Sequence, residues 1–192
     1  MIKATYSDKS LIVDILVQSF DTNKSINFIV QQDSKRLQRI KILMEYSFEI
    51  CYMFGSVFLS EDRKGCALIL HPEKKATTLK SMYWDTKLAF YCIGISRISK
   101  VLKRESLIKN NHPKTPICYL WFLAVHPDEQ KQGIGSKLIK SIIQKSVEDK
   151  RDIYLETSTL TNIEWYQKFN FKIIKELDLG YKLFIFKRSY RN

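Results

Sequence analysis

The sequence predicts a single α/β (α+β) domain in which helices flank a mixed, mostly antiparallel sheet. The order of the predicted elements, two helices, two strands, a helical stretch and then alternating strands and helices, is typical of such a domain. The chain has 192 residues, enough for one hydrophobic core. Hydrophobic residues make up 45% of the chain and charged residues 27%, a composition that indicates a globular rather than a disordered protein.

Each element follows from the spacing of its apolar residues, which is helical in some stretches and strand-like in others. Ser7 or Asp8 is expected to cap the first helix. Residues 73–117 are predicted to be a helical insertion between two evident strands. In chain order we expect helices 8–20 and 33–54, strands 56–59 and 66–70, helical stretches 79–93 and 95–108, strand 118–125, helix 134–147, strand 153–156, helix 162–169 and strands 172–177 and 182–187.

The chain is basic, with 32 Lys and Arg residues against 20 Asp and Glu residues and a net charge of +12. The densest stretch is 97–114, in which Glu105 is the one acidic residue. We interpret it as a solvated helix face, which we favour over a nucleic-acid-binding patch. A third interpretation is local attraction for an anionic cofactor.

The cysteines and the apolar runs bear on the compartment and on metal binding. The four cysteines are far apart, with no CxxC pair and no Cys/His ligand spacing, so we expect buried thiols in a reducing cytoplasm and no metal site. The longest apolar run, 118–125, is less than half of a membrane span, so no membrane association is expected. Residues 1–8 are polar, and no secretory signal is visible.

A glycine-containing loop at 130–136 follows the apolar strand and begins a helix. A loop that leads into a helix leaves several backbone N–H groups unpaired at the positive end of the helix dipole, which suits a phosphate group. Gly133 and Gly135 have no Cβ, so a pyrophosphate can approach the backbone, and Ser136 can add a hydroxyl. The loop fits neither a Walker A motif nor a Rossmann GxGxxG motif, because Leu138 stands three residues beyond Gly135.

The loop has the pattern Gln-x-x-Gly-x-Gly at Gln130, Gly133 and Gly135, after a Val-x-Pro exit from the strand at Val125 and Pro127. This pattern resembles the acetyl-CoA signature of the GNAT superfamily of N-acetyltransferases. The resemblance implies a sheet that splays apart between strands 4 and 5. It also implies that 118–171 is the acetyl-CoA-binding core within a single domain 1–192.

A second stretch of the chain carries the same resemblance. Residues 154–157 followed by 162–171 are similar to the family's strand 5 and the helix after it. Asn162 and Tyr166 are four residues apart, so they share one face of that helix. Asn170 stands where the family has glycine, and asparagine tolerates the left-handed conformation well. The long insertion and the spacing of Asn162 and Tyr166 resemble the puromycin-type small-molecule branch.

The resemblance implies a role for each candidate residue. Tyr166 is expected to act as the general acid toward the departing thiolate, because the ordinary pKa of a phenol, about 10, is close to that of a thiol. Glu156 is the candidate base for the acceptor amine, directly or through a water; its other interpretation is a surface salt bridge. Asn162 is expected to bind the cofactor arm or else to cap its helix. The residues expected to contact acetyl-CoA are Leu123, Ala124, Val125, Gln130, Lys131, Gln132, Gly133, Ile134, Gly135, Ser136, Asn162 and Tyr166.

The function expected from the sequence is transfer of an acetyl group from acetyl-CoA to a primary amine, without a covalent enzyme intermediate. The acceptor is a small molecule or a peptide, and the protein is a monomer or a homodimer. A non-catalytic GNAT-like module that binds CoA or a protein is the second hypothesis. A basic nucleic-acid-binding protein is the third, and it would show a steep loss of nucleic-acid affinity with salt.

Overall fold

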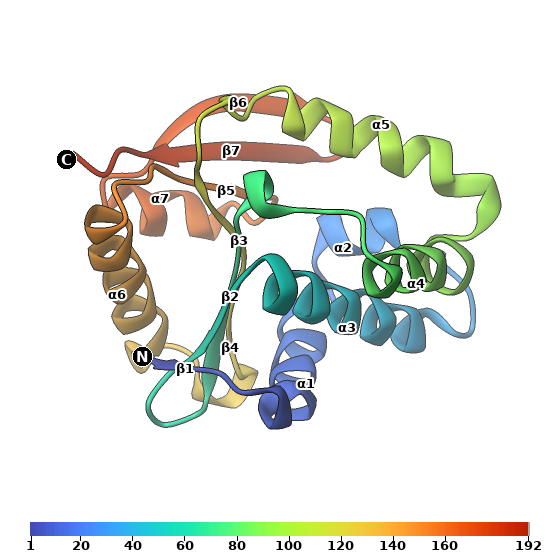
Figure 1. The fold of residues 1–192 in the computed structure, drawn as a ribbon, viewed down its shortest axis with the longest axis horizontal. Helices are drawn as coiled ribbons and strands as arrows, with labels where there is room; N and C mark the ends of the chain where they lie inside the picture. Colours follow the sequence, from blue (N-terminus) through green and yellow to red (C-terminus); the bar gives the residue numbers. More distant parts are fainter. Residues whose placement is uncertain (192) are drawn as a thin grey trace.

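The computed structural model describes residues 1–191, and its centre is a seven-stranded sheet (Figure 1). The strand order is β1-β2-β3-β4-β5-β7-β6, and every neighbouring pair is antiparallel except β4 and β5, which are parallel. This confirms the predicted mixed sheet. The strands are β1 (Ile2–Lys3), β2 (Gly55–Leu59), β3 (Gly65–Leu70), β4 (Cys118–Val125), β5 (Ile153–Thr157), β6 (Lys172–Asp178) and β7 (Lys182–Arg188).

Helices cover both faces of the sheet, and each face has its own core (Figure 1). On one face α1 and α3 bury side chains such as Leu16, Met44 and Phe48. On the other face Ile142 of α6 and Tyr166 of α7 share a core with Phe186 of β7. The helices are α1 (Lys9–Phe20), α2 (Lys24–Ile29), α3 (Arg36–Phe54), α4 (Leu79–Lys87), α5 (Ile98–Lys109), α6 (Ile134–Glu148) and α7 (Thr161–Gln167), with a π-helical turn over Leu88–Ile93 between α4 and α5.

Strands β4 and β5 pair only at their first residues and then diverge. The register contains two pairs, Cys118 with Ile153 and Tyr119 with Tyr154. Beyond them β4 remains paired with β3, and β5 remains paired with β7. The sheet is therefore forked in its middle, while each arm of the fork is held by its other neighbour.

A β-bulge in β4 lies just after the fork begins. Leu120 pairs with Ile69 and Phe122 with Leu68, so Trp121 has no partner on β3. An extra residue in one strand shifts the alternation of its side chains between the two faces. Trp121 and Phe122 therefore contact the same core, on the α1–α3 side, whereas Leu123 packs on the α6–α7 side.

The predicted elements are confirmed within a few residues at their ends, with two omissions and two corrections. The sequence did not indicate β1 or α2, which have two and six residues. Neither Ser7 nor Asp8 caps α1 through a side-chain hydrogen bond; the Asp8 carboxylate instead accepts from the backbone N–H of Thr5 at 2.8 Å.

The interpretation of 97–114 as a solvated face is wrong for two of its cations. Arg104 is 7% exposed, and its guanidinium donates to other elements. The Arg97 guanidinium donates to the backbone carbonyl of Val30 at 2.9 Å and to that of Phe28. Both side chains therefore attach α5 and the turn before it to the rest of the fold.

All four cysteines are free and buried, as predicted. Within residues 1–191, no group of three or more His, Cys, Asp or Glu side chains could hold a metal ion. None of the helices described is long and apolar enough to span a bilayer.

We expect Gly55→Ala to lower the free energy of unfolding by at least about 1–3 kcal/mol, the usual cost of overpacking. Gly55 joins α3 directly to β2, and a Cβ there would lie 1.9 Å from the backbone oxygen of Ile69. Urea denaturation measures the effect. Gly135→Ala is the control, because its Cβ would make only ordinary contacts at 3.7 Å. Equal stability of the two variants would contradict the prediction.

Candidate functional site

A cleft of about 1780 Å³ opens where β4 and β5 diverge. Ligand pockets typically measure about 300–1,000 Å³, so this cleft has room for two ligands side by side. One wall consists of β4, β5 and the first turns of α6 and α7, and the other of α2 to α5. The cleft is lined by all the predicted site residues except Gln132, namely Leu123, Ala124, Val125, Gln130, Lys131, Gly133, Ile134, Gly135, Ser136, Glu156, Asn162 and Tyr166.

The edge of β4 that borders the fork carries backbone groups of Leu123 and Val125. Residues of an antiparallel pair alternate between bonding each other and pointing away. The N–H of His126 donates to the carbonyl of Lys64 at 2.8 Å. By the alternation, the backbone groups of Ala124, two residues earlier, also bond β3, and those of Leu123 and Val125 face the fork. The Val125 carbonyl already accepts from Ser19 Oγ at 2.9 Å and from Gln130 Nε2 at 3.2 Å. The Leu123 backbone therefore remains for a ligand.

The loop before α6 has the conformation that its glycines allow. Gly133 has φ of +82° at the N-cap position, and nothing lies within 4 Å of the place where a Cβ would be. The N–H groups of Ile134, Gly135 and Ser136 donate to no other residue among 1–191, as expected in a first helical turn. Three free donors at the positive end of a fifteen-residue helix fit an anionic diphosphate.

Gln132 is the exception among the predicted residues. Its side-chain amide donates to Glu129 at 3.0 Å on the exposed side of the loop, outside the lining of the cleft. Its assignment to the cofactor has no support from this geometry. Gln130 lines the cleft, and its side-chain amide holds the end of β4.

Asn162 and Tyr166 both lie on α7 and both line the cleft. Leu160 occupies the N-cap of that helix, so Asn162 does not cap it, and its side chain makes no hydrogen bond within residues 1–191. Asn170, after the helix, has φ of +61°, which confirms that it takes the left-handed conformation expected of the family's glycine.

The Tyr166 ring is buried among aromatic side chains, while its hydroxyl has no hydrogen-bond partner in the part of the chain described. Its ring centroid lies 4.9 Å from that of Trp165, 5.5 Å from Phe171 and 5.6 Å from Phe186. Burial, and to a lesser extent the charge of Glu156, raises the pKa of Tyr166 above its ordinary value. The pKa of this phenol is therefore higher than the ordinary value on which the expected match with a thiol rests. The hydroxyl is a weaker acid that stays protonated and can donate a hydrogen bond.

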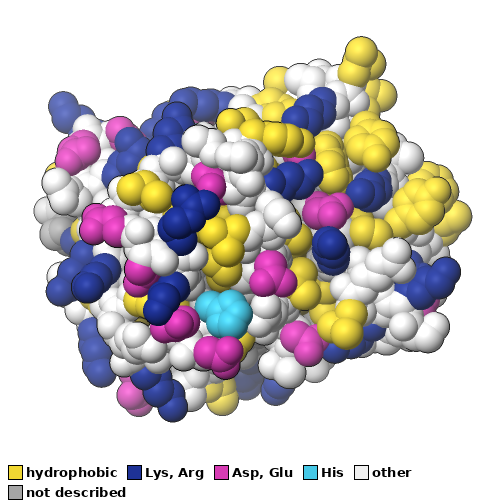
Figure 2. Space-filling model, turned by 90° about the horizontal axis from the view of Figure 1, so that it is seen from below, with side chains coloured by type: hydrophobic (Ala, Val, Ile, Leu, Met, Phe, Trp, Pro, Cys, Tyr) yellow, Lys and Arg dark blue, Asp and Glu magenta, His cyan; other side chains and the backbone are white. Residues whose placement is uncertain are grey.

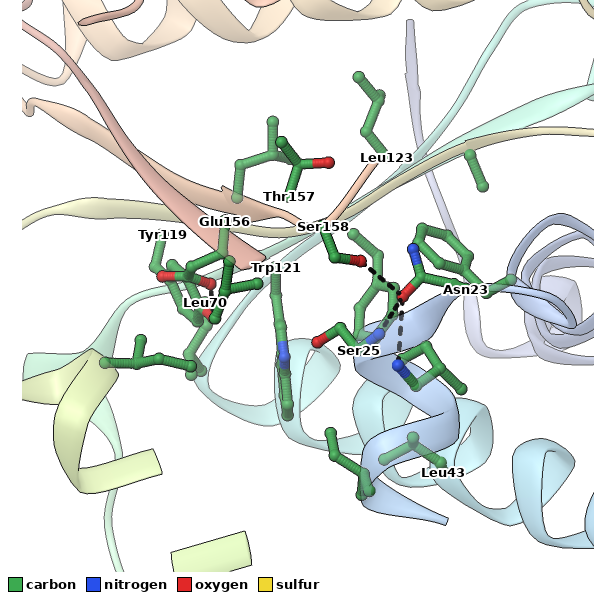
Figure 3. A pocket seen from close by; sticks show the side chains of 18 of the residues that line it. Asn23, Ser25, Leu43, Leu70, Tyr119, Trp121, Leu123, Glu156, Thr157 and Ser158 are labelled. Carbon is green, nitrogen blue, oxygen red and sulfur yellow. Dashed lines mark hydrogen bonds between the residues drawn. The ribbon is translucent and has the colours of Figure 1, made fainter. Parts of the chain in front are cut away.

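Glu156 lies in the cleft on β5, next to the fork, and its side chain is 8% exposed. Tyr119 donates its hydroxyl to Glu156 Oε2 at 2.6 Å, and His112 Nε2 lies 3.3 Å from Oε1 (Figure 3 shows Tyr119 beside Glu156). The alternative interpretation of Glu156 as a surface salt bridge is therefore wrong. Burial, with the charge of Glu156 as a further cause, raises the pKa of Tyr119 well above its ordinary value.

Sequence reasoning missed His112 and Tyr119 as neighbours of Glu156. His112 follows α5 and is 44 residues from Glu156 in the chain, and Tyr119 is 37 residues away. A His-Pro pair and a strand tyrosine give no local signal of such a contact. His126 precedes the turn Pro127–Glu129 and is not part of the lining.

Comparison with known proteins agrees with this geometry. Residues 88–173 match the model of the acetyltransferase (GNAT) domain. The fold is similar to that of a histone acetyltransferase HPA2 and related acetyltransferase from Corynebacterium glutamicum, with a TM-score of 0.69 at 20% identity over 98% of this chain and 94% of that one.

Two further solved structures are similar over nearly their whole length. They are arylalkylamine N-acetyltransferase 2 from Aedes aegypti, with TM-score 0.63, 14% identity and coverage of 98% and 97%, and an N-acetyltransferase from Staphylococcus aureus, with TM-score 0.58, 12% identity and coverage of 97% and 98%. Such identities establish the fold, and function must be argued from the site. The forked sheet, the loop before α6 and the match over residues 88–173 agree with one another, and this part of the chain is similar to a GNAT acetyltransferase domain.

Proposed function

We propose that the protein transfers the acetyl group of acetyl-CoA directly to a primary amine. The observation that carries this proposal is the convergence of three groups on one cleft. These are the free N–H groups at the start of α6, the Tyr166 hydroxyl and the Glu156 carboxylate. A free-thiol release assay with acetyl-CoA and a panel of amines tests it.

The residues of the fork bind and orient the cosubstrate. The first turn of α6 holds the diphosphate through the N–H groups of Ile134, Gly135 and Ser136. The backbone of Leu123 pairs with the pantetheine arm like a short extra strand, and the side-chain amide of Asn162 binds the same arm. An N–H on the β4 edge polarises the acetyl carbonyl, so that negative charge developing on its oxygen is stabilised.

Two side chains handle the protons of the reaction. Glu156 accepts the proton that the acceptor amine must lose, directly or through a water, and Tyr119 and His112 fix its carboxylate. Tyr166 donates from its hydroxyl to the sulfur as the thioester bond breaks. Its raised pKa keeps the hydroxyl protonated, so that it can donate a hydrogen bond to the sulfur as negative charge develops there.

The thiols of the chain do not support a covalent intermediate. None of the four cysteines lines the cleft, and burial raises the pKa of Cys92 and of Cys118 to about 12. A nucleophilic cysteine needs a thiolate and access to its substrate. Direct attack of the amine is therefore the proposed route. The puromycin-type branch and the division into an insertion over 73–117 and a core over 118–171 stay predictions.

We expect acetyl-CoA to raise the melting temperature, because a ligand at a hundredfold excess over its Kd stabilises the folded state by about 2.7 kcal/mol. For a chain of this size, each kcal/mol corresponds to roughly 2–4 °C. Gly135→Val should abolish the shift by filling the place where the diphosphate approaches. Gly135→Ala, whose Cβ has room, should retain more of it. If Gly135→Val kept the full acetyl-CoA shift in melting temperature, the assignment of this loop to the cofactor would be contradicted.

We expect Glu156→Gln to reduce the rate most at low pH. An alkyl amine with a pKa of about 10 is mainly protonated at pH 7, so a base is needed most there and least above pH 10. A pH–rate profile from about 6 to 10 measures this dependence. Tyr119→Phe is the control, since it keeps the carboxylate and removes one of its donors. Overlapping profiles of wild type and Glu156→Gln would make Glu156 a structural residue.

We expect Tyr166→Phe to lower kcat by about 10²–10⁴-fold, the usual effect of losing a general acid. The acetyl-CoA thermal shift should barely change, because the hydroxyl acts mainly in the transition state. Stability should also stay close to that of wild type, since this hydroxyl has no partner within residues 1–191. Wild-type turnover in the variant would exclude Tyr166 as the general acid. A large loss of stability would instead reveal a structural hydrogen bond of its hydroxyl.

A further inference from the structure

The half of the cleft on the α1–α3 side of the fork has a different character from the half at α6. Trp121 projects into it from the bulge in β4, between Glu156 and Tyr119 on one side and Ser25 of α2 on the other (Figure 3). The indole ring is stacked beside Tyr119, with centroids 6.3 Å apart at 25°, and Tyr46 meets its edge at 6.1 Å. This half of the cleft therefore has an aromatic wall.

The Trp121 indole N–H has no hydrogen-bond partner among residues 1–191, although this residue lines the cleft. Most polar groups of this kind in folded proteins are paired with protein or water. The aromatic wall thus carries a free donor at its surface, a few residues along β4 from the fork.

One end of this half is closed by three segments that are distant in sequence. The buried guanidinium of Arg104 on α5 donates to Ser25 Oγ of α2 at 2.6 Å and to the Tyr181 hydroxyl of the β6–β7 turn at 3.0 Å. The ring of Phe28 on α2 packs on that of Tyr181, with centroids 5.4 Å apart. An extended polypeptide that passed through the cleft at this end would have to break these contacts.

Two carboxylates are positioned to attract a cationic amine. Glu156 lies beside the aromatic wall, and Asp85 lines the cleft from α4, where it accepts from the Tyr46 hydroxyl at 2.8 Å. Among the residues described, Asp85 forms no ion pair with a lysine or arginine. A protonated amine that enters this half thus meets a carboxylate at the rim and another at the reaction centre.

These features combine with the proposed function. Given amine acetylation at the fork, we propose that this half of the cleft is the acceptor site and that it takes a small primary amine carried on a flat aromatic body. The ring lies against Trp121, the amine points to Glu156, and the closed end excludes a lysine within a folded protein or an internal peptide segment. Aromatic contacts favour such a ring over an alkyl chain of similar polarity.

The test compares three acceptors with wild-type protein in the free-thiol release assay, namely 2-phenylethylamine, propylamine and a peptide with one internal lysine. We expect kcat/KM for 2-phenylethylamine to exceed that for either of the others about tenfold or more, mainly through a lower KM. Equal values, or the highest value for the peptide, would overturn this inference and leave the proposed function standing. Thiol release with none of them, despite an acetyl-CoA thermal shift, would overturn both.

A pair of variants locates the preference. Trp121→Leu should reduce the ratio of kcat/KM between 2-phenylethylamine and propylamine about tenfold, with the acetyl-CoA thermal shift unchanged. Tyr83→Leu is the matched control, because Tyr83 is an exposed aromatic on α4 outside the cleft. If Trp121→Leu left the ratio of kcat/KM between the two amines unchanged, the placement of the acceptor ring against Trp121 would be overturned. If that variant does not fold, the ratio measured on wild type still decides the substrate class.

Discussion

The short parallel pairing of β4 with β5 is the constraint on which the rest of the structure depends. A strand in the middle of a sheet normally satisfies its backbone groups on both edges, and an open edge is a liability that proteins cover. Here two residue pairs hold the strands together, and the arms then separate while β3 and β7 keep each arm in place. The fork therefore presents backbone donors and acceptors inside a covered cleft, where a ligand rather than another strand can use them.

The bulge at Trp121 allows one strand to serve both halves of that cleft. Without it, Trp121 and Leu123 would lie on the same face of the sheet, because side chains alternate with a period of two. With one extra residue, Trp121 joins the α1–α3 side and Leu123 the α6–α7 side. The aromatic wall and the cofactor edge are thus two residues apart in sequence and on opposite sides of the fork (Figure 3).

Part of the basic charge of the chain is used in hydrogen bonds and ion pairs of the fold itself. Arg97 and Arg104 are used inside the fold, and Lys64 pairs with Glu129 at 2.9 Å. Figure 2 shows lysine and arginine side chains interspersed with acidic and apolar ones rather than gathered into one stripe on the face seen from below. Hydrophobic side chains gather instead at its right-hand end, the end where α4 lies in Figure 1.

Sequence reasoning succeeded where a short stretch of chain determines the structure. The loop at Gly133, the helix after it and the shared face of Asn162 and Tyr166 are all encoded within about ten residues, by backbone freedom and helical spacing. It failed where contacts join distant segments. The contact between Arg104 and Tyr181 spans 77 residues, and that between His112 and Glu156 spans 44. No local pattern distinguishes such residues from solvated surface ones.

The hydrogen bonds of the cleft are unevenly distributed, and the imbalance has a physical meaning. Both oxygens of Glu156 have partners, and Arg104 is bound on several sides, so these charges are fixed before any ligand arrives. The hydroxyl of Tyr166 and the indole N–H of Trp121 have none among the residues described. Neither atom is among the fully buried ones that lack a partner, so solvent can reach both in the free protein. A ligand acceptor that replaces water at either donor gains most in the transition state, where the acceptor carries the most charge.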